Sequence, residues 1–337
     1  MRYYGGKGKL VDFIFETSRQ FAGESYSFAD AFSGTGVVGL EARKRSHYVE
    51  ANDILYFSQC LATSNLCFTS SHGFEKLGGL EFAIEHLNSL HPLQGSITEH
   101  YSPHGSAGRQ YFSRANAMKI DAIRTQIELW FDAGQVNPTE KQALIGLLMR
   151  AINRVSNVTG TYGAYLKNWD SRAHKDLRLD PQELNTYGPI GVSYNLDVNA
   201  FLKQSEVDVV YLDPPYNSRD YSSNYFLLEL IADGNLSKDL APRGVTGSIS
   251  YPEKKSLFSS KRAVRAAFET MFESIQAPIA LLSYNNEGLI PIPELVSLMA
   301  DFGPVEAVKK SHKRFRSINQ DGSNVKTDEH LLVLRKA

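Results

Sequence analysis

Apolar residues along the chain recur at two spacings that alternate with each other. Between Leu10 and Phe21 they follow the period of a helix with one buried face. Short apolar runs that end in polar or acidic residues are typical of buried strands, and they occupy residues 27–31, 48–53, 192–197, 209–213 and 279–286. Further helical patterns cover residues 37–44, 221–231, 261–275 and 295–300. This alternation predicts an α/β fold with a doubly wound, mostly parallel sheet.

The alternation is interrupted between residues 71 and 189. The interruption begins with a polar stretch rich in Gly, Ser, His and Pro. Two helical patterns follow, at 113–133 and 138–155, and the second opens on Thr139-Glu-Lys-Gln, which resembles a capping box. We therefore expect an inserted, largely helical region.

The insertion divides the chain into two predicted parts. Residues 1–70 and 190–337 form the sheet domain, and residues 71–189 form the inserted region. The sheet domain is expected to close with an antiparallel pair of strands at 305–310 and 329–334. A length of 337 residues allows one large domain or two ordinary ones.

The chemistry that stands out lies in Val209-Val-Tyr-Leu-Asp213-Pro214-Pro215-Tyr216. The prolines lack N–H donors and end the strand, and ligands of open α/β sheets bind at the carboxyl ends of strands. The Asp213 carboxylate and the Pro214 carbonyl could accept the hydrogens of a planar amine such as the 6-amino group of adenine. Tyr216 could stack on the base, which must leave the duplex to be reached. The plain alternative is a Pro-Pro turn with a satisfied aspartate.

A second group of residues favours adenosine binding. Glycines 34, 36 and 39 lie between a predicted strand and a predicted helix, as in nucleotide-binding sheets. Asp53 ends the next strand about 20 residues later, where a carboxylate can bind ribose hydroxyls; an aspartate that caps the following helix is the alternative. Asp197 ends another strand beside the same crevice.

The N-terminal segment is a glycine-rich turn before the first helix. Gly6 would let the backbone approach a ligand closely, and Lys7 offers a point charge for a carboxylate or phosphate. The alternative is an ordinary flexible start.

The net charge of the chain limits how it can bind a charged partner. The formal net charge is −1, so the molecule has no global basic field and any surface for a polyanion must be local. A basic run at 309–316 includes Lys313 and Arg314, and a loop at 154–169 is dense in residue types that touch phosphates. From that loop we select as DNA-contact candidates Arg154, Asn157, Tyr162 and Lys167.

The remaining signals argue for a reduced cytoplasmic protein without a metal. Cys60 and Cys67 have no histidine or acid at ligand spacing and are expected to be reduced core residues. The histidines are scattered, so no metal site is expected. The start has no apolar signal region, and no run approaches a membrane span, so we expect no membrane partner and a cytoplasmic location.

The order of these motifs resembles the Dam-like alpha arrangement of DNA adenine methyltransferases, and it is similar to the modification enzymes of type II restriction systems. The resemblance rests on the motifs around Tyr4, Asp30, Asp53, Asp197 and Asp213, in that order. It extends to residues 159–167, 217–225 and 283–288. In that family the cofactor motifs precede the catalytic turn and a target-recognition segment separates them, which matches the insertion here.

The resemblance implies a Rossmann-like class I methyltransferase fold with S-adenosylmethionine as the methyl donor. Tyr4, Gly6 and Lys7 would hold its methionine end. The rest of its site would be formed by Asp30, Phe32, Gly34, Gly36, Asp53 and Asp197. Asp213, Pro214, Pro215 and Tyr216 would be catalytic, and Tyr221 and Asn224 join the DNA-contact candidates. The partners implied are double-stranded DNA and a cognate restriction endonuclease that acts on the same sequence.

Other functions stay open on the sequence. Similar turns serve an RNA base or the 4-amino group of cytosine, and a partner subunit could keep the fold without catalysis. The glycine turn also fits a dinucleotide oxidoreductase, which leaves Asp213–Tyr216 unexplained.

Overall fold

The computed structural model describes residues 6–69, 73–184, 187–236, 240–318 and 324–336, with side chains outside 311–327. Within these ranges lies a sheet with the strand order β3-β2-β1-β4-β5-β7-β6. Its strands are β1 (Phe28–Asp30), β2 (Val49–Asn52), β3 (Val192–Tyr194), β4 (Val209–Leu212), β5 (Ile279–Asn285), β6 (Val305–Ile318) and β7 (Asn324–Arg335). The first five are parallel, so their carboxyl ends share one edge of the sheet.

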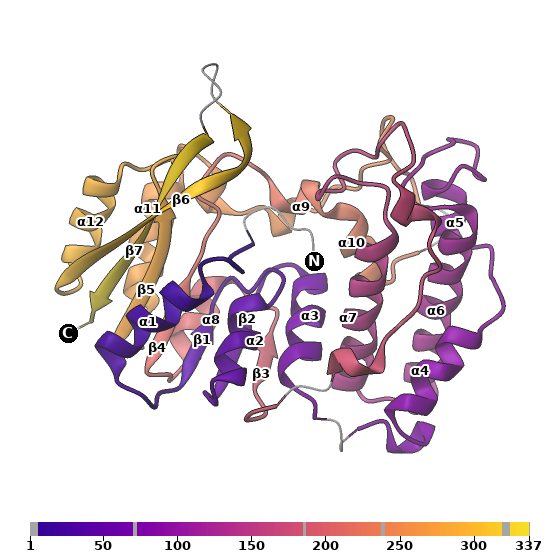
Figure 1. Ribbon diagram of the computed structural model, residues 1–337, viewed down its shortest axis with the longest axis horizontal. Helices are drawn as coiled ribbons and strands as arrows, with labels where there is room; N and C mark the ends of the chain where they lie inside the picture. The colour runs from indigo at the N-terminus through magenta and orange to yellow at the C-terminus, as the bar shows by residue number, and fades with distance from the viewer. Residues whose placement is uncertain (1–5, 70–72, 185–186, 237–239, 319–323, 337) are drawn as a thin grey trace.

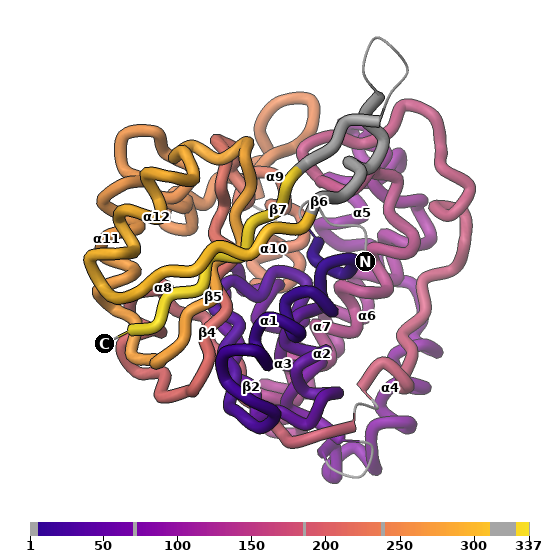
Figure 2. The backbone as a smooth tube through the Cα atoms, turned by 60° about the vertical axis from the view of Figure 1, so that its left-hand side comes forward, coloured from indigo at the N-terminus to yellow at the C-terminus, as the bar shows by residue number. Residues whose placement is uncertain are grey.

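Strand β7 runs the other way. It lies between β5 and β6 and is antiparallel to both, and both members of this pair are longer than the sequence predicts. Because of its direction, its first residues lie at the edge where the parallel strands end: Glu329 is paired with Asn285, the last residue of β5. Figure 2 shows β6 and β7 running side by side along the molecule.

Helices cover both faces of the sheet, which confirms the doubly wound α/β prediction. Apolar side chains of α1, α2 and α3 pack on one face, and those of α8, α11 and α12 pack on the other. These helices are α1 (Val11–Ala22), α2 (Val37–Lys44), α3 (Tyr56–Leu66), α8 (Val198–Gln204), α11 (Val264–Ser274) and α12 (Ile292–Ala300).

A helical part stands beside the sheet, on the side of β3 and α3 (Figure 1). Its core joins α3 to the six helices α4 (Leu80–Ser89), α5 (Ser96–Tyr101), α6 (Arg114–Asp132), α7 (Pro138–Val155), α9 (Tyr221–Asn224) and α10 (Phe226–Asp233). Helix α7 lies so close to α3 that a Cβ on Gly146 would be 2.3 Å from the Cys60 carbonyl oxygen. The helical part is therefore built on α3.

Residues after the turn that follows β4 also belong to this core. The buried Arg109 donates to the carbonyls of Gly244 and Val245, and Tyr101 donates to that of Gly247 at 2.8 Å. The predicted division places everything after residue 190 in the sheet domain. In the structure, residues 225–236 and 240–251 pack with the helices instead.

Several sequence expectations for the helices were wrong in detail. Helices α4 and α5 lie in the stretch that looked merely polar, because each buries only a few side chains between exposed ones. The predicted helix at 221–231 is two helices, which meet at Tyr225 where φ is −121°. The capping box of α7 is formed by Asn137 and Glu140, not by Thr139.

Both cysteines are free, with Cys60 buried and Cys67 partly buried, in agreement with the prediction. Among the helices of the described residues, none is both long enough and apolar enough to cross a membrane.

Candidate active site

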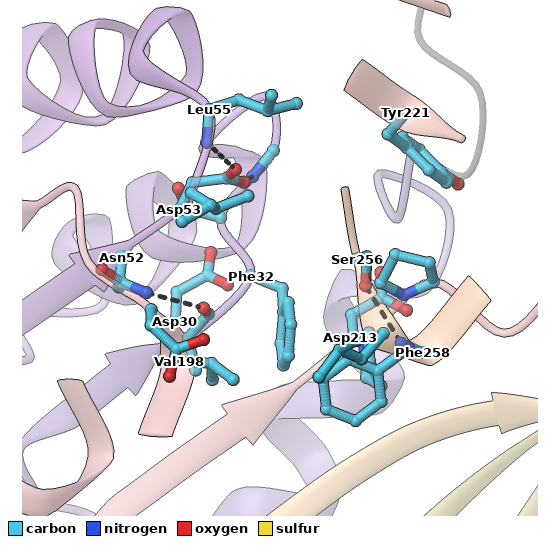
Figure 3. Close-up of a pocket in the computed structure, with 18 of the residues that line it drawn as sticks. Asp30, Phe32, Asn52, Asp53, Leu55, Val198, Asp213, Tyr221, Ser256 and Phe258 are labelled. Atoms are coloured by element: carbon cyan, nitrogen blue, oxygen red, sulfur yellow. Dashed lines mark hydrogen bonds between the residues drawn. The ribbon is translucent and has the colours of Figure 1, made fainter. Parts of the chain in front are cut away.

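A pocket of about 350 Å³ opens where β1, β2 and β4 end (Figure 3). Its walls are the turns after these strands, the turn before α8, residues 253–258 and one side of α11. Most of the predicted ligand residues line it: Gly6, Lys7, Asp30, Phe32, Gly34, Asp53, Asp197 and Asp213–Tyr216. Tyr4 lies outside the described residues.

The glycine turn after β1 is held by its own backbone geometry. Gly36 has a φ of 70°, and a Cβ there would lie 2.5 Å from Asn65 Nδ2, so only glycine fits. Gly36 does not line the pocket; it shapes the turn that carries Phe32 and Gly34 into it. The buried Asp30 accepts a hydrogen bond from the Gly39 N–H at 3.0 Å, and burial raises its pKa to about 7.

Asp53 connects this turn to the next one. Its carboxylate accepts hydrogen bonds from the N–H groups of Gly34 at 2.8 Å and Leu55 at 2.9 Å. Burial raises its pKa to about 6, and these two hydrogen bonds oppose the rise. The side chain lines the pocket while fixing both loops. It does not cap the following helix, since α3 has no side-chain cap and Glu229 accepts from its first N–H groups; binding of ribose by Asp53 stays a prediction.

Polar atoms without partners point to a ligand on this side of the pocket. Ser33 Oγ and Asn199 Oδ1 are buried and have no hydrogen-bond partner among the described residues, and both residues line the pocket. Buried polar atoms normally have partners. Asp197, in contrast, is exposed at the rim and caps α8 through the Asn199 N–H at 2.9 Å.

An aromatic pair lies between the two acidic sides of the pocket. In Figure 3, Phe32 stands between Asp30 and Asp53 on one side and Asp213 on the other. The Phe32 and Phe258 rings meet edge to face with centroids 5.6 Å apart. Phe258 was not predicted, because it follows an irregular stretch with no motif.

The turn after β4 presents the predicted catalytic group. The Asp213 carboxylate lies 3.2 Å from the buried Lys7 ammonium. Burial raises the pKa of Asp213 to about 6, and Lys7 lowers it. The Tyr216 ring lies 5.7 Å from the same ammonium and packs edge-on against Tyr284. Lys7 thus faces the Asp213–Tyr216 turn directly.

A buried ion pair connects one wall of the pocket to helices α3 and α10. Glu229 of α10 is fully buried and accepts hydrogen bonds from the first two N–H groups of α3, Tyr56 and Phe57. Lys254, which lines the pocket, forms an ion pair with the same carboxylate. Sequence reasoning missed this pair because its members lie on separate segments that meet only in the fold.

The DNA-contact candidates fall into different environments. Asn157 and Tyr162 are wholly buried, so in this structure neither offers surface to DNA. Asn157 instead donates to the carbonyls of Gln110 and Leu166 and accepts from the Asp170 N–H, which fixes the loop. Arg154 forms an ion pair with Glu183.

The other candidates remain predictions. Lys167 is exposed, Tyr221 lines the pocket and Asn224 is partly buried with its carbonyl bonded to the Tyr162 N–H. Lys313 and Arg314 lie in β6, and their side chains are outside the described residues.

Comparison with known proteins gives consistent matches over the chain. A model of the D12 class N6 adenine-specific DNA methyltransferases matches residues 3–261. The chain is similar to the type II methyltransferase M.NlaIII of Neisseria lactamica, with 34% identity covering 100% of this chain and 99% of the relative. It is 32% identical to M.CviAII of Paramecium bursaria Chlorella virus 1, covering 98% and 97%. M.FokI of Planomicrobium okeanokoites is 33% identical over all of this chain, which spans 53% of that relative.

Proposed function

Because the chain belongs to the family of D12 class N6 adenine-specific DNA methyltransferases, it is an adenine-specific DNA methyltransferase of the type II restriction-modification kind, and we propose that the pocket described above is its active site. The observation that supports this most strongly is the shared cavity. One continuous pocket contains the acid-lined glycine turn and the Asp213–Tyr216 turn.

The residues of the acid-lined side fit S-adenosylmethionine. Asp30 and Asp53 provide carboxylates, Phe32 provides an apolar face, and Ser33 and Asn199 provide buried polar atoms without protein partners. When bound, S-adenosylmethionine supplies a methyl group activated by a sulfonium. We assign Gly6, Gly34 and Asp197 to the same site and Gly36 to shaping it.

The turn after β4 is suited to hold the acceptor. At neutral pH the Asp213 carboxylate is mostly ionised, because its pKa is about 6, and it can accept one hydrogen of the adenine 6-amino group. The Pro214 carbonyl accepts the other, and Tyr216 offers a ring face for stacking. Accepting both hydrogens orients the amine lone pair toward the methyl group, and holding the reactants in line is the main contribution expected of these residues.

The adenine must leave the DNA duplex to enter such a pocket. We propose that residues 71–189 form the target-recognition region, since they build most of the helical part that stands beside the sheet (Figure 1). A restriction endonuclease that cuts the same sequence is the expected cellular partner, and the cytoplasm is the expected location.

The test is transfer of labelled methyl groups from S-adenosylmethionine to unmethylated DNA by the wild type, Asp213→Ala and Asp213→Asn. We expect both variants to lose at least about a hundredfold in rate, because each removes the anionic acceptor of the amine. Cofactor binding by calorimetry is the control and should persist. Wild-type rates in either variant would contradict the assignment of Asp213.

A further inference from the structure

We propose that Glu329 of β7, whose carboxylate contacts the pocket residue Lys7, is a positioning residue of the active site that holds Lys7 against Asp213. The inference rests on the proposed function of the Asp213 turn. It concerns a residue outside the matched family region, which ends at residue 261.

The geometry places one ammonium between two carboxylates. Lys7 Nζ donates a hydrogen bond to Glu329 Oε1 and lies 3.2 Å from Asp213 Oδ1. All three side chains are largely withdrawn from solvent, with 7%, 6% and 17% exposed for Lys7, Glu329 and Asp213. Buried charges of this kind need partners, and Lys7 is shared between the two acids.

The direction of β7 explains how a residue near the chain end arrives here. Leu331 and Val333 face the same core as α1, so Glu329, two residues earlier, faces that side too. Lys7 lies just before α1. The Ser283 hydroxyl on β5 donates to Glu329 Oε1 at 2.9 Å and fixes the carboxylate from a second strand.

Glu329 changes the electrostatics of the catalytic acid as well as the place of Lys7. Burial raises the pKa of Asp213, Lys7 lowers it, and the negative charge of Glu329 raises it. Within the described part of the chain, Asp30 of β1 is a further acid that interacts with Asp213. The pKa of Asp30 depends on burial, Gly39, Asp213 and Asp53. A change at Glu329 therefore shifts the pKa of Asp213 directly and that of Asp30 only through Asp213. The tyrosines that also neighbour Asp213 are Tyr211, Tyr216 and Tyr221. Burial raises the pKa of Tyr211 and of Tyr221 above the ordinary value, so both stay neutral at these pH values.

Removing the charge of Glu329 should shift the pH at which the transfer rate rises. If transfer needs ionised Asp213, the rate rises with pH through the pKa of this group. Glu329→Gln keeps an oxygen for Lys7 and Ser283 but removes the negative charge, so the rise should move to lower pH by about one unit. At pH 5, the rate of the variant divided by its own plateau rate should be about five times the same ratio for the wild type. Lys7→Met should move the rise to higher pH.

The experiment is the pH profile of single-turnover methyl transfer to DNA at saturating S-adenosylmethionine. Glu306→Gln is the matched control, because Glu306 is an exposed carboxylate on the adjacent strand that pairs with Arg335. Its profile should superimpose on that of the wild type. A profile of Glu329→Gln that falls by one factor at every pH, with the rise unmoved, would show a merely structural role and overturn the proposal.

A second measurement tests the cluster without methyl transfer. Unfolding of Lys7→Met, Glu329→Gln and the double variant in urea forms a double-mutant cycle, and contacting charges should give non-additive effects. Additive effects would overturn the proposal. Absence of methyl transfer by the wild type would count against the proposed function alone, because the cycle would still report on Glu329.

Discussion

Three aspartates at the strand ends bear raised pKa values: about 7 for Asp30 and about 6 for both Asp53 and Asp213. Burial is the first cause in each case, because a carboxylate loses hydration there. A cationic ligand would compensate this cost. The three carboxylates therefore favour the binding of a positively charged ligand. They lower the stability of the protein while that ligand is absent.

This cost gives a prediction for Asp30→Asn without ligand. A carboxyl group with a pKa of about 7 when folded and 3.8 when unfolded binds more protons in the native state, so the wild type loses stability as pH rises from about 4 to 7. Asparagine removes that loss and can still accept from Gly39. At pH 8 the variant should be more stable by on the order of 2–4 kcal/mol, and at pH 4 the two should match.

Urea unfolding at both pH values measures this difference. A variant less stable than the wild type at pH 8 would contradict the account of Asp30. Calorimetry should also show weaker binding of S-adenosylmethionine by the variant.

At the residue level, the sequence correctly placed side chains at the pocket where the chemistry is local in the chain, while their roles stay predictions. Asp213 to Tyr216 could be identified because the prolines must end a strand, and Asp53 because an acid follows β2. Glu229 and Glu329 could not, since each meets its lysine across long stretches of chain. The burial of Asn157 was likewise invisible in a loop of polar composition.

At the level of elements, the contact between α3 and α7 supports both the pocket and the helical part. Gly146 allows this approach, because a Cβ there would lie 2.3 Å from the Cys60 oxygen and 2.8 Å from Ser64 Oγ. Gly146→Ala should therefore push the helices apart and cost about 2–4 kcal/mol of unfolding free energy, despite the better helix propensity of alanine.

Urea unfolding also measures this effect, with Gly8→Ala as the control, since a Cβ at Gly8 meets nothing within 4 Å. Equal stability of Gly146→Ala and the wild type would mean that the two helices are not in tight contact.

The strands and the helices α1, α2, α11 and α12 could be predicted from spacing, because each buries a regular apolar face. Helices α3 and α8 were not predicted: α3 buries polar as well as apolar side chains on nearly all sides, and α8 is only seven residues long. The short α4 and α5 could not be predicted either, since their apolar faces are small and lie within polar sequence. The length of β6 and β7 was also missed, because their outer halves consist mainly of charged and polar residues.

For the whole molecule, a net charge of −1 means that contact with DNA must be local. Lys313→Ala with Arg314→Ala should weaken binding to all sequences and reduce the slope of log affinity against log salt by roughly one for each phosphate that is no longer neutralised. Binding titrations at several salt concentrations measure this slope.

Lys44→Ala with Lys203→Ala is the matched control, because both lysines are exposed in the last turns of α2 and α8, away from the carboxyl ends of the strands. The control should keep the wild-type slope. An unchanged slope in the Lys313 and Arg314 variant would reject a role of this run in DNA binding.

The most direct test of the central claim is the identity of the methylated product. Unmethylated genomic DNA is incubated with the protein and S-adenosylmethionine, digested to nucleosides and analysed by mass spectrometry, and the modified positions are mapped by sequencing. The account predicts N6-methyladenine in one defined sequence, lost with Asp213→Ala. Methylated cytosine, or methyl groups on RNA but none on DNA, would contradict it.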